Sequence, residues 1–128
     1  MQKVTGIGGI FFRAKDPEML NKWYEKNLGI PLPPTTYDES EWQQGAGSTV
    51  FSAFAVSDEN KNEENYYNPS RQSFMINFRV KDLDAMLKQL RKAGATVRED
   101  IGEYPNGRFS WVIDPEGNKV ELWEPKDP

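Results

Sequence analysis

The sequence predicts an α+β fold made of two similar halves, and repeated segments are the main evidence for it. Residues 12–16 (F-R-A-K-D) recur 66 positions later as residues 78–82 (F-R-V-K-D). Residues 47–51 correspond in the same way to residues 117–121, at an offset of 70. In each half an alternating apolar segment precedes a helical apolar pattern, and further alternating segments follow it. Repetition in this order predicts two tandem strand–helix–strand–strand–strand (βαβββ) units.

The first half, residues 1–56, begins with a predicted strand over residues 4–14. Asp16 and Pro17 are the residue types expected at a helix N-cap and first helical position, and Gly29 is a typical C-cap. The apolar face expected for this helix consists of Met19, Leu20, Trp23, Tyr24 and Leu28. Two further strands are predicted over residues 41–44 and 50–56.

The polar, turn-rich residues 57–72 are interpreted as a linker, and residues 73–125 as the second half. Asp82 is the expected N-cap of a second helix that ends near Gly94. The apolar face of this helix consists of Leu83, Met86, Leu87 and Leu90. Around it, strands are predicted to include Ile76, Phe78 and Val80 and to cover residues 96–99, 108–113 and 119–124, with a hairpin turn at residues 104–108.

Composition places limits on the function. The chain has 128 residues, which suits a single domain with a real core, and its net charge is −4. This acidic balance argues against nucleic-acid or anionic-membrane binding. No apolar run approaches the roughly 20 residues that span a bilayer, and residues 1–9 do not resemble a signal peptide. We therefore expect a cytoplasmic protein whose ligand is a small molecule.

The absence of histidine is the most informative count. With no His there is no Ser-His-Asp triad and no imidazole base that works near neutral pH. The commonest ligand for zinc, nickel, copper and non-haem iron is also missing, and there is no Cys to replace it. Any metal would have to be held by carboxylates, amide oxygens or water.

Alternation along the strands predicts which side chains share a face of the sheet. Asn77 and Arg79 are expected on the face away from the helices, and so are Glu121 and Trp123 of the last strand. The same rule places Phe51 on this face. A carboxylate beside an indole on one face is either a surface charge or part of a site.

The last strand and the turn before it carry a recognisable motif. Residues 114–122 (D-P-E-G-N-K-V-E-L) resemble the D-P-x-G-N-x-x-E-[LI] signature of the vicinal oxygen chelate superfamily, which includes glyoxalase I, bleomycin resistance proteins and extradiol dioxygenases. The resemblance implies that the two βαβββ modules form a curled eight-stranded mixed sheet with the helices outside. It also implies a homodimer, and in this family Glu121 would be a metal ligand.

The other metal positions of the family lack suitable ligands in this chain. The repeat offsets match the four family positions to Gly9, Phe51, Met75 and Glu121. A glycine has no side chain, and a Met thioether is a soft, weak donor. We therefore predict that the metal centre is absent and that the protein uses no cofactor.

The leading hypothesis is a metal-free protein that binds an aromatic or amphipathic molecule in a concave cavity. Binding is predicted to rest on four aromatic residues, with three polar residues orienting the ligand. The aromatic residues are Phe11, Phe51, Trp111 and Trp123, and the polar residues are Asn77, Arg79 and Glu121.

Other interpretations stay open at this point. Glu121 can instead be a structural carboxylate paired with Arg79 or Arg13, and the aromatic residues can simply fill space. The alternative function is a lyase, isomerase or dioxygenase-type enzyme in which Glu121 is the acid/base or a metal ligand. A third interpretation is a domain without catalysis that acts through its partners.

Overall fold

The computed structural model describes residues 1–54 and 72–126, and these residues form an α+β fold. The helices are α1 (Pro17–Leu28) and α3 (Leu83–Lys92). The strands are β1 (Asn77–Arg79), β2 (Thr96–Val97), β3 (Gly102–Tyr104), β4 (Gly107–Ile113) and β5 (Lys119–Pro125). The predicted linker lies outside the described residues except for Gln72. No helix in the described ranges is long and apolar enough to cross a membrane.

Both helices begin where their capping residues predict. The Asp16 side chain accepts a hydrogen bond from the Met19 amide (3.1 Å), and Asp82 accepts one from the Ala85 amide (3.0 Å). Helix α1 ends at Gly29, whose φ of 72° is the left-handed conformation that glycine adopts at low cost. These contacts confirm both helices of the sequence analysis.

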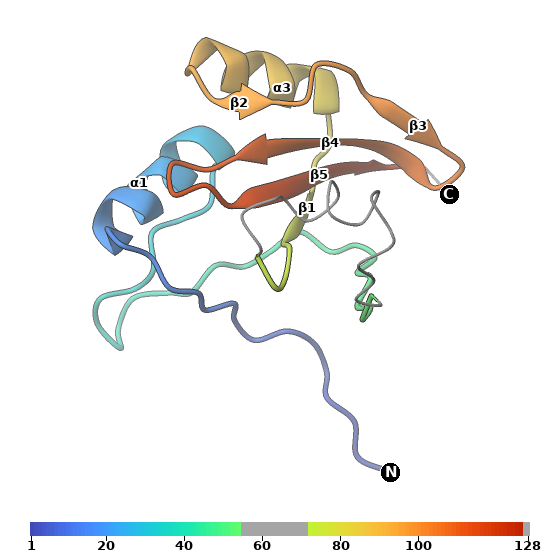
Figure 1. Ribbon diagram of the computed structural model, residues 1–128. Helices are drawn as coiled ribbons and strands as arrows, with labels where there is room; N and C mark the ends of the chain where they lie inside the picture. Colours follow the sequence, from blue (N-terminus) through green and yellow to red (C-terminus); the bar gives the residue numbers. More distant parts are fainter. Residues whose placement is uncertain (55–71, 127–128) are drawn as a thin grey trace.

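The strands form one mixed sheet in the order β1-β5-β4-β2, with β3 paired to β4. Strand β1 runs parallel to β5, and the other pairs are antiparallel. The long β4–β5 hairpin is the centre of this sheet, and β1 is at its edge. In Figure 1 the helix α3 lies on one side of these strands, and residues 31–54 pass on the other side.

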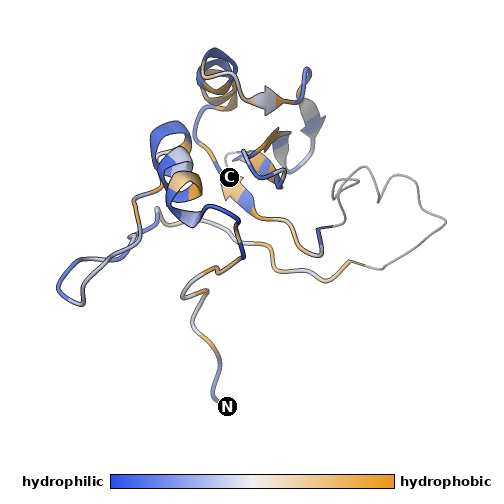
Figure 2. Ribbon diagram, turned by 60° about the vertical axis from the view of Figure 1, so that its left-hand side comes forward, coloured by the Kyte–Doolittle hydropathy of each residue, from blue (hydrophilic) through white to orange (hydrophobic). Residues whose placement is uncertain are grey.

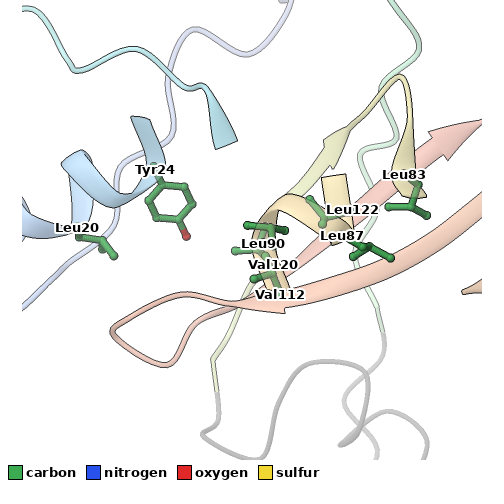
Figure 3. Packing of buried hydrophobic residues seen from close by; sticks show 8 residues of the cluster. All are labelled: Leu20, Tyr24, Leu83, Leu87, Leu90, Val112, Val120 and Leu122. Atoms are coloured by element: carbon green, nitrogen blue, oxygen red, sulfur yellow. The ribbon is translucent and has the colours of Figure 1, made fainter. Parts of the chain in front are cut away.

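The core lies between the helices and one face of the sheet. Its buried members come from both helices and from β4 and β5, as Figure 3 shows: Leu20, Tyr24, Leu83, Leu87, Leu90, Val112, Val120 and Leu122. Alternation explains the contribution of the strands, because Val120 and Leu122 face the helices while Glu121 between them faces the other way. The predicted apolar sides of α3, β4 and β5 are thus confirmed, and so is that of α1 except for Met19, which is exposed.

The turn between β4 and β5 attaches α1 to the sheet. Buried Asp114 accepts hydrogen bonds from the amides of Glu116 (2.9 Å) and Asn118 (3.0 Å), which fix the turn, and from the hydroxyl of Tyr24 (2.7 Å) on α1. The Glu116 carboxylate accepts from the amides of Lys15 (2.6 Å) and Asp16 (2.8 Å) at the start of α1. The motif that carried the family resemblance is therefore a structural connection in this chain.

A carboxylate of the last strand holds α3 in a comparable way. Glu124 accepts a hydrogen bond from the Leu83 amide (2.8 Å), which is at the first residue of α3. Arg108 of β4 contacts Glu124 (3.5 Å) and also Asp84 of α3 (2.9 Å). Both helices are therefore fixed to the β4–β5 hairpin through their N-terminal ends.

Three strands predicted in the first half are not formed in the structure. Residues 4–14, 41–44 and 50–54 have no strand partners and follow irregular, extended paths, and residues 55 and 56 lie outside the described part. Figure 2 shows the N-terminal segment as a loose strand-free trace leading away from the sheet. Side-chain alternation predicts which face is apolar, but a strand also needs a neighbouring backbone to pair with. The alternating pattern alone was therefore insufficient here.

The second half follows the prediction more closely. Strands β4 and β5 each extend one residue beyond the predicted range, β2 is two residues shorter, and β1 coincides with the predicted strand around Phe78. Strand β3 was not predicted. It pairs with β4 through a turn at Pro105 and Asn106, which confirms the hairpin expected at residues 104–108.

Candidate functional site

The sheet face away from the helices brings together five of the seven predicted site residues. Asn77 lies opposite Glu121 across the β1–β5 pair, and Arg79 lies opposite Trp123. Trp111 of β4 lies opposite Glu121 on its other side. Because paired residues have their side chains on the same face, these five residues form one continuous surface. We call this surface the sheet face.

The polar centre of the sheet face is a contact between a carboxylate and an amide. The Asn77 Nδ2 group donates a hydrogen bond to Glu121 Oε1 (2.6 Å). The sequence leaves open an ion pair of Glu121 with Arg79 or Arg13, and the structure shows the Asn77 amide bonded to this carboxylate. Since Asn77 is exposed and Glu121 half-buried, the carboxylate is oriented by the amide while its surroundings stay partly open.

Arg79 is directed toward the first half of the chain. Its Nη2 group donates to the carbonyl oxygen of Gly45 (3.1 Å), and Gly47 lies so close to the guanidinium that a Cβ there would collide with it. Glycine at position 47 therefore lets the backbone approach Arg79 directly. This contact holds the segment around residues 45–47 at the β1 edge of the sheet face.

Lys119 and Trp111 form one end of the sheet face. The Lys119 ammonium lies over the Trp111 ring, 5.3 Å from its centroid, and only 9% of Lys119 is exposed. Burial lowers the pKa of Lys119 from its usual value, although the nearby charge of Glu121 acts in the opposite direction. The Lys119 backbone is held by the Gln72 side chain. The Lys119 amide donates to Gln72 Oε1 (2.8 Å), and the Lys119 carbonyl oxygen accepts from Gln72 Nε2 (3.0 Å).

Three aromatic rings form the other end. The Phe109 and Trp123 rings are stacked, with centroids 6.0 Å apart and planes inclined by 7°, and Tyr104 meets Phe109 edge-on at 5.7 Å. Trp123 is 9% exposed, and its indole N–H donates to the Asn106 carbonyl oxygen (3.0 Å) in the β3–β4 turn. Trp123 is thus held in place, whereas Phe109 is only half-buried.

The two remaining predicted residues are not on the sheet face. Phe11 and Phe51 lie outside any strand, and each residue is 92% exposed. Their predicted placement depended on strands over residues 4–14 and 50–56. Since those strands are not formed within the described residues, the register argument for Phe11 and Phe51 does not apply.

The donors around Glu121 do not fit a divalent metal. Its described neighbours on the sheet face include the Asn77 amide, two indoles and, two residues earlier on β5, the Lys119 ammonium. A hard cation needs several oxygen ligands and is repelled by a nearby ammonium. Over residues 1–54 and 72–126 no three acidic side chains are grouped as a metal site would require.

Sequence reasoning missed two members of this surface, Lys119 and Phe109. Both follow from the alternation that identified the others, because Lys119 is two residues from Glu121 and Phe109 is two residues from Trp111. Lys119 was placed only at the start of a strand, and nothing in the sequence indicates that its ammonium lies over an indole.

Comparison with known proteins identifies a domain family and solved structures of similar fold. A family model described as "Glyoxalase-like domain" matches residues 9–123. No curated protein sequence matches the chain. Among solved structures, TnmS3, an antibiotic-binding protein from Streptomyces sp. CB03234, is similar with a TM-score of 0.63 and 20% identity, over 98% of this chain and 100% of that one.

Two other solved structures are similar over nearly the whole chain. A glyoxylase/bleomycin resistance protein/dioxygenase domain from Frankia sp. EAN1pec has a TM-score of 0.61 and 16% identity, over 98% of this chain and 95% of that one. A lactoylglutathione lyase from Agrobacterium tumefaciens has a TM-score of 0.58 and 15% identity, over 96% of both chains. At these identities the similarity concerns the fold.

Proposed function

The chain belongs to the glyoxalase-like domain family, and from this membership we propose that it binds a small planar aromatic or amphipathic molecule on the sheet face without a metal ion. The observation that carries the proposal is the arrangement of side chains on that face. Half-buried rings at both ends flank one oriented carboxylate at the centre. Aromatic walls with a few fixed polar groups are typical of small-molecule sites.

The contacts define what kind of ligand fits. A planar ring system would stack on Trp111 or Phe109, where aromatic pairs add about 0.5–1.5 kcal/mol beyond the area they bury. Glu121 is an acceptor that Asn77 already orients, so it would receive an N–H or O–H of the ligand. A neutral molecule with one donor and one acceptor suits a face that also carries the Lys119 ammonium.

One similar structure supports the binding proposal over simple structural packing. TnmS3 is described as an antibiotic-binding protein, and its fold matches this chain over its full length. The shared fold does not determine the ligand, because one fold hosts many functions. Sequestration of a molecule without chemistry is the function that agrees both with this neighbour and with the donors around Glu121.

We further propose that two copies of the chain assemble and enclose the sheet face. Apolar side chains of the first half are unusually exposed, including Phe11 and Phe51 at 92% each and Val50 at 75%. Exposed apolar surface of this extent is typical of a protein interface. In a homodimer, residues 1–56 and 73–125 would form two βαβββ modules and an eight-stranded sheet. The cytoplasmic location stays a prediction from the sequence.

The binding proposal is tested by calorimetric titration with naphthalene-2-carboxamide, a planar neutral probe with one donor group and one acceptor. Trp111→Ala is expected to weaken binding about fivefold, because it removes one aromatic contact worth about 1 kcal/mol. Tyr37→Ala is the matched control, since Tyr37 is fully exposed and lies outside the sheet. Equal affinity of the Trp111 variant and the control would refute binding on this face.

The metal-free part is tested by elemental analysis of untagged protein, because a His tag would add ligands that this chain lacks. We expect less than about a tenth of an equivalent of any divalent transition metal, given the donors around Glu121. Near one equivalent would refute this part of the proposal.

The second candidate function is an enzyme in which Glu121 moves a proton. The 2.6 Å contact with Asn77 favours it, because an oriented carboxylate on a partly open face is what an acid/base group requires. Glu121→Gln separates the two functions. An enzyme would lose turnover while still binding its ligand, whereas a binder of neutral aromatic molecules would keep most of its affinity.

A further inference from the structure

The two helices form a groove on their outer side, which is separate from the sheet face. The groove has a volume of about 510 Å³ and runs between α1 and α3. Its lining residues are Met19, Lys22, Trp23, Lys26, Asn27, Gln89, Lys92 and Ala93. Figure 2 shows both helices on the same side of the strands, so the groove and the sheet face lie on different sides of the molecule.

The lining combines an apolar base with positive charge. Trp23 is half-buried and its ring packs edge-on against Tyr24 of the core at 5.1 Å, so the indole has a fixed position. Three ammonium groups lie around it, and no carboxylate contributes to the lining. In a chain of net charge −4, this is a local concentration of positive charge.

A hydrogen bond links the two helices that line the groove. The Gln89 side chain of α3 donates to the Asn27 carbonyl oxygen of α1 (3.1 Å), and the Asn27 side chain donates to the Trp23 carbonyl oxygen (3.1 Å). The bond from Gln89 to Asn27 links the two helices, and the bond from Asn27 to Trp23 lies within α1 and orients the Asn27 side chain. The groove is therefore a preformed feature of the helix pair, which reduces the cost of ordering it on binding.

A simpler role explains part of the charge. Lys26 is in the last turn of α1 and Lys92 ends α3, where a cation stabilises a helix through its dipole. The helix dipole does not explain Lys22, which lies a turn earlier. Lys22 pairs with Glu18 at 3.2 Å, but both side chains are mostly exposed. Because such surface ion pairs contribute little, a bound anion can replace Glu18 as the partner of Lys22.

We propose that the groove binds a small amphipathic anion, with an aromatic body against Trp23 and an acidic group among Lys22, Lys26 and Lys92. The volume lies within the range of about 300–1,000 Å³ that small-molecule sites occupy. Stacking on an indole and attraction to ammonium groups act on different parts of the same ligand, so a ligand with both parts should bind more tightly than one with either alone. This site is independent of the proposed function of the sheet face.

The test uses naphthalene-2-sulfonate as the probe and the indole N–H signals of the ¹⁵N-labelled protein as reporters. The chain has four tryptophans, so the signals separate the two sites directly. Trp23 reports on the groove, and Trp111 and Trp123 report on the sheet face. We expect the Trp23 signal to shift with added probe and to shift less with 2-naphthalenemethanol, which has no charge.

Matched variants separate local charge from overall charge. Lys26→Gln combined with Lys92→Gln removes two groove cations, and we expect the Kd to rise about thirtyfold, because each close charge pair is worth about 1 kcal/mol in water and about 1.4 kcal/mol corresponds to a factor of ten. Lys81→Gln combined with Lys88→Gln removes two exposed lysines outside the groove and is expected to leave the Kd unchanged. Raising the ionic strength from about 0.01 M to about 1 M should also weaken binding.

Each other outcome overturns the proposal. An unchanged Trp23 signal at a probe concentration of about 1 mM would mean that the groove has no useful affinity. An equal rise of the Kd in both double variants would mean that only the overall charge matters. A shift of Trp111 and Trp123 without Trp23 would place the probe on the sheet face, which would contradict this site while supporting the proposed function.

Discussion

The buried hydrogen bond between Tyr24 and Asp114 allows a quantitative test of how α1 is attached to the sheet. The Tyr24 hydroxyl lies 2.7 Å from Asp114 Oδ2, and Asp114 is only 3% exposed. That oxygen also accepts from the Asn118 side-chain amide (2.8 Å). Tyr24→Phe therefore removes one of two donors without changing the packing of the ring.

The expected cost follows from the nature of this bond. A hydrogen bond to a charged group contributes about 1.5–3 kcal/mol, so we expect Tyr24→Phe to lower the free energy of unfolding by about 2 kcal/mol near neutral pH. Urea unfolding followed by circular dichroism measures this loss. Tyr37→Phe, at a fully exposed tyrosine, is the control and should change the free energy of unfolding by less than about 0.5 kcal/mol.

The same bond gives a pH dependence with a definite sign. Burial, followed by the hydrogen bond to Asp114 and its charge, raises the pKa of Tyr24 well above the ordinary value of 10.0. The folded state therefore keeps a proton that the unfolded state loses, and stability falls as the pH rises above 10.0. The difference in stability between the wild type and Tyr24→Phe should shrink by up to about 1.4 kcal/mol per pH unit there.

Two results would refute this reasoning. One is a loss below about 0.5 kcal/mol near neutral pH, which is the ordinary range for surface substitutions. The other is a difference between the two proteins that stays constant from about pH 8 to about pH 11, where the linkage relation requires it to shrink.

Three further predictions concern the turns and the contacts of the β4–β5 hairpin. Glu116→Gln should lower the free energy of unfolding by about 1 kcal/mol in urea titrations. The Glu116 carboxylate accepts hydrogen bonds from two backbone amides at the start of α1, and a glutamine side chain keeps only one of these two acceptor oxygens. An unchanged urea midpoint would contradict this prediction. Arg108→Leu should raise the pKa of Asp84 toward its ordinary 3.8, because the hydrogen bond from Arg108 holds that pKa low. The stability that this lowered pKa contributes is present above pH 3.8 and is lost as the pH falls. Carboxyl NMR titration of the two proteins detects the change in the pKa of Asp84. Gly107→Ala should lower the free energy of unfolding more than Gly117→Ala does. A Cβ at Gly107 would collide with the hairpin backbone and the Trp123 indole, whereas a Cβ at Gly117 would meet open space. Equal melting temperatures of the two variants would contradict this prediction.

Local chemistry explains why the helices and the last hairpin were predictable. Asp16 and Asp82 cap their helices through their own neighbouring amides, so the sequence contains all the information. The D-P-E-G-N turn is equally local. The side-chain faces of β4 and β5 also follow from alternation, which is why Glu121 and Trp123 were assigned to the correct face.

The features that were not predictable depend on residues far apart in the sequence. Arg79 contacts Gly45, and Lys119 is held by Gln72 and lies over Trp111. None of these partners is fixed by spacing. The prediction that Phe11 and Phe51 lie on strands was wrong for a related reason. A strand must pair with a second backbone, and an alternating sequence pattern does not show whether that backbone is present.

The sheet face as a ligand site is tested most directly by titrating ¹⁵N-labelled protein with naphthalene-2-carboxamide and following the four indole N–H signals. We predict that Trp111 and Trp123, which flank Glu121, shift together with a single Kd, and that Trp23 in the helix groove does not move. Shifts confined to Trp23 or to Trp42, or no shift at any indole at a probe concentration of about 1 mM, would contradict binding on the sheet face.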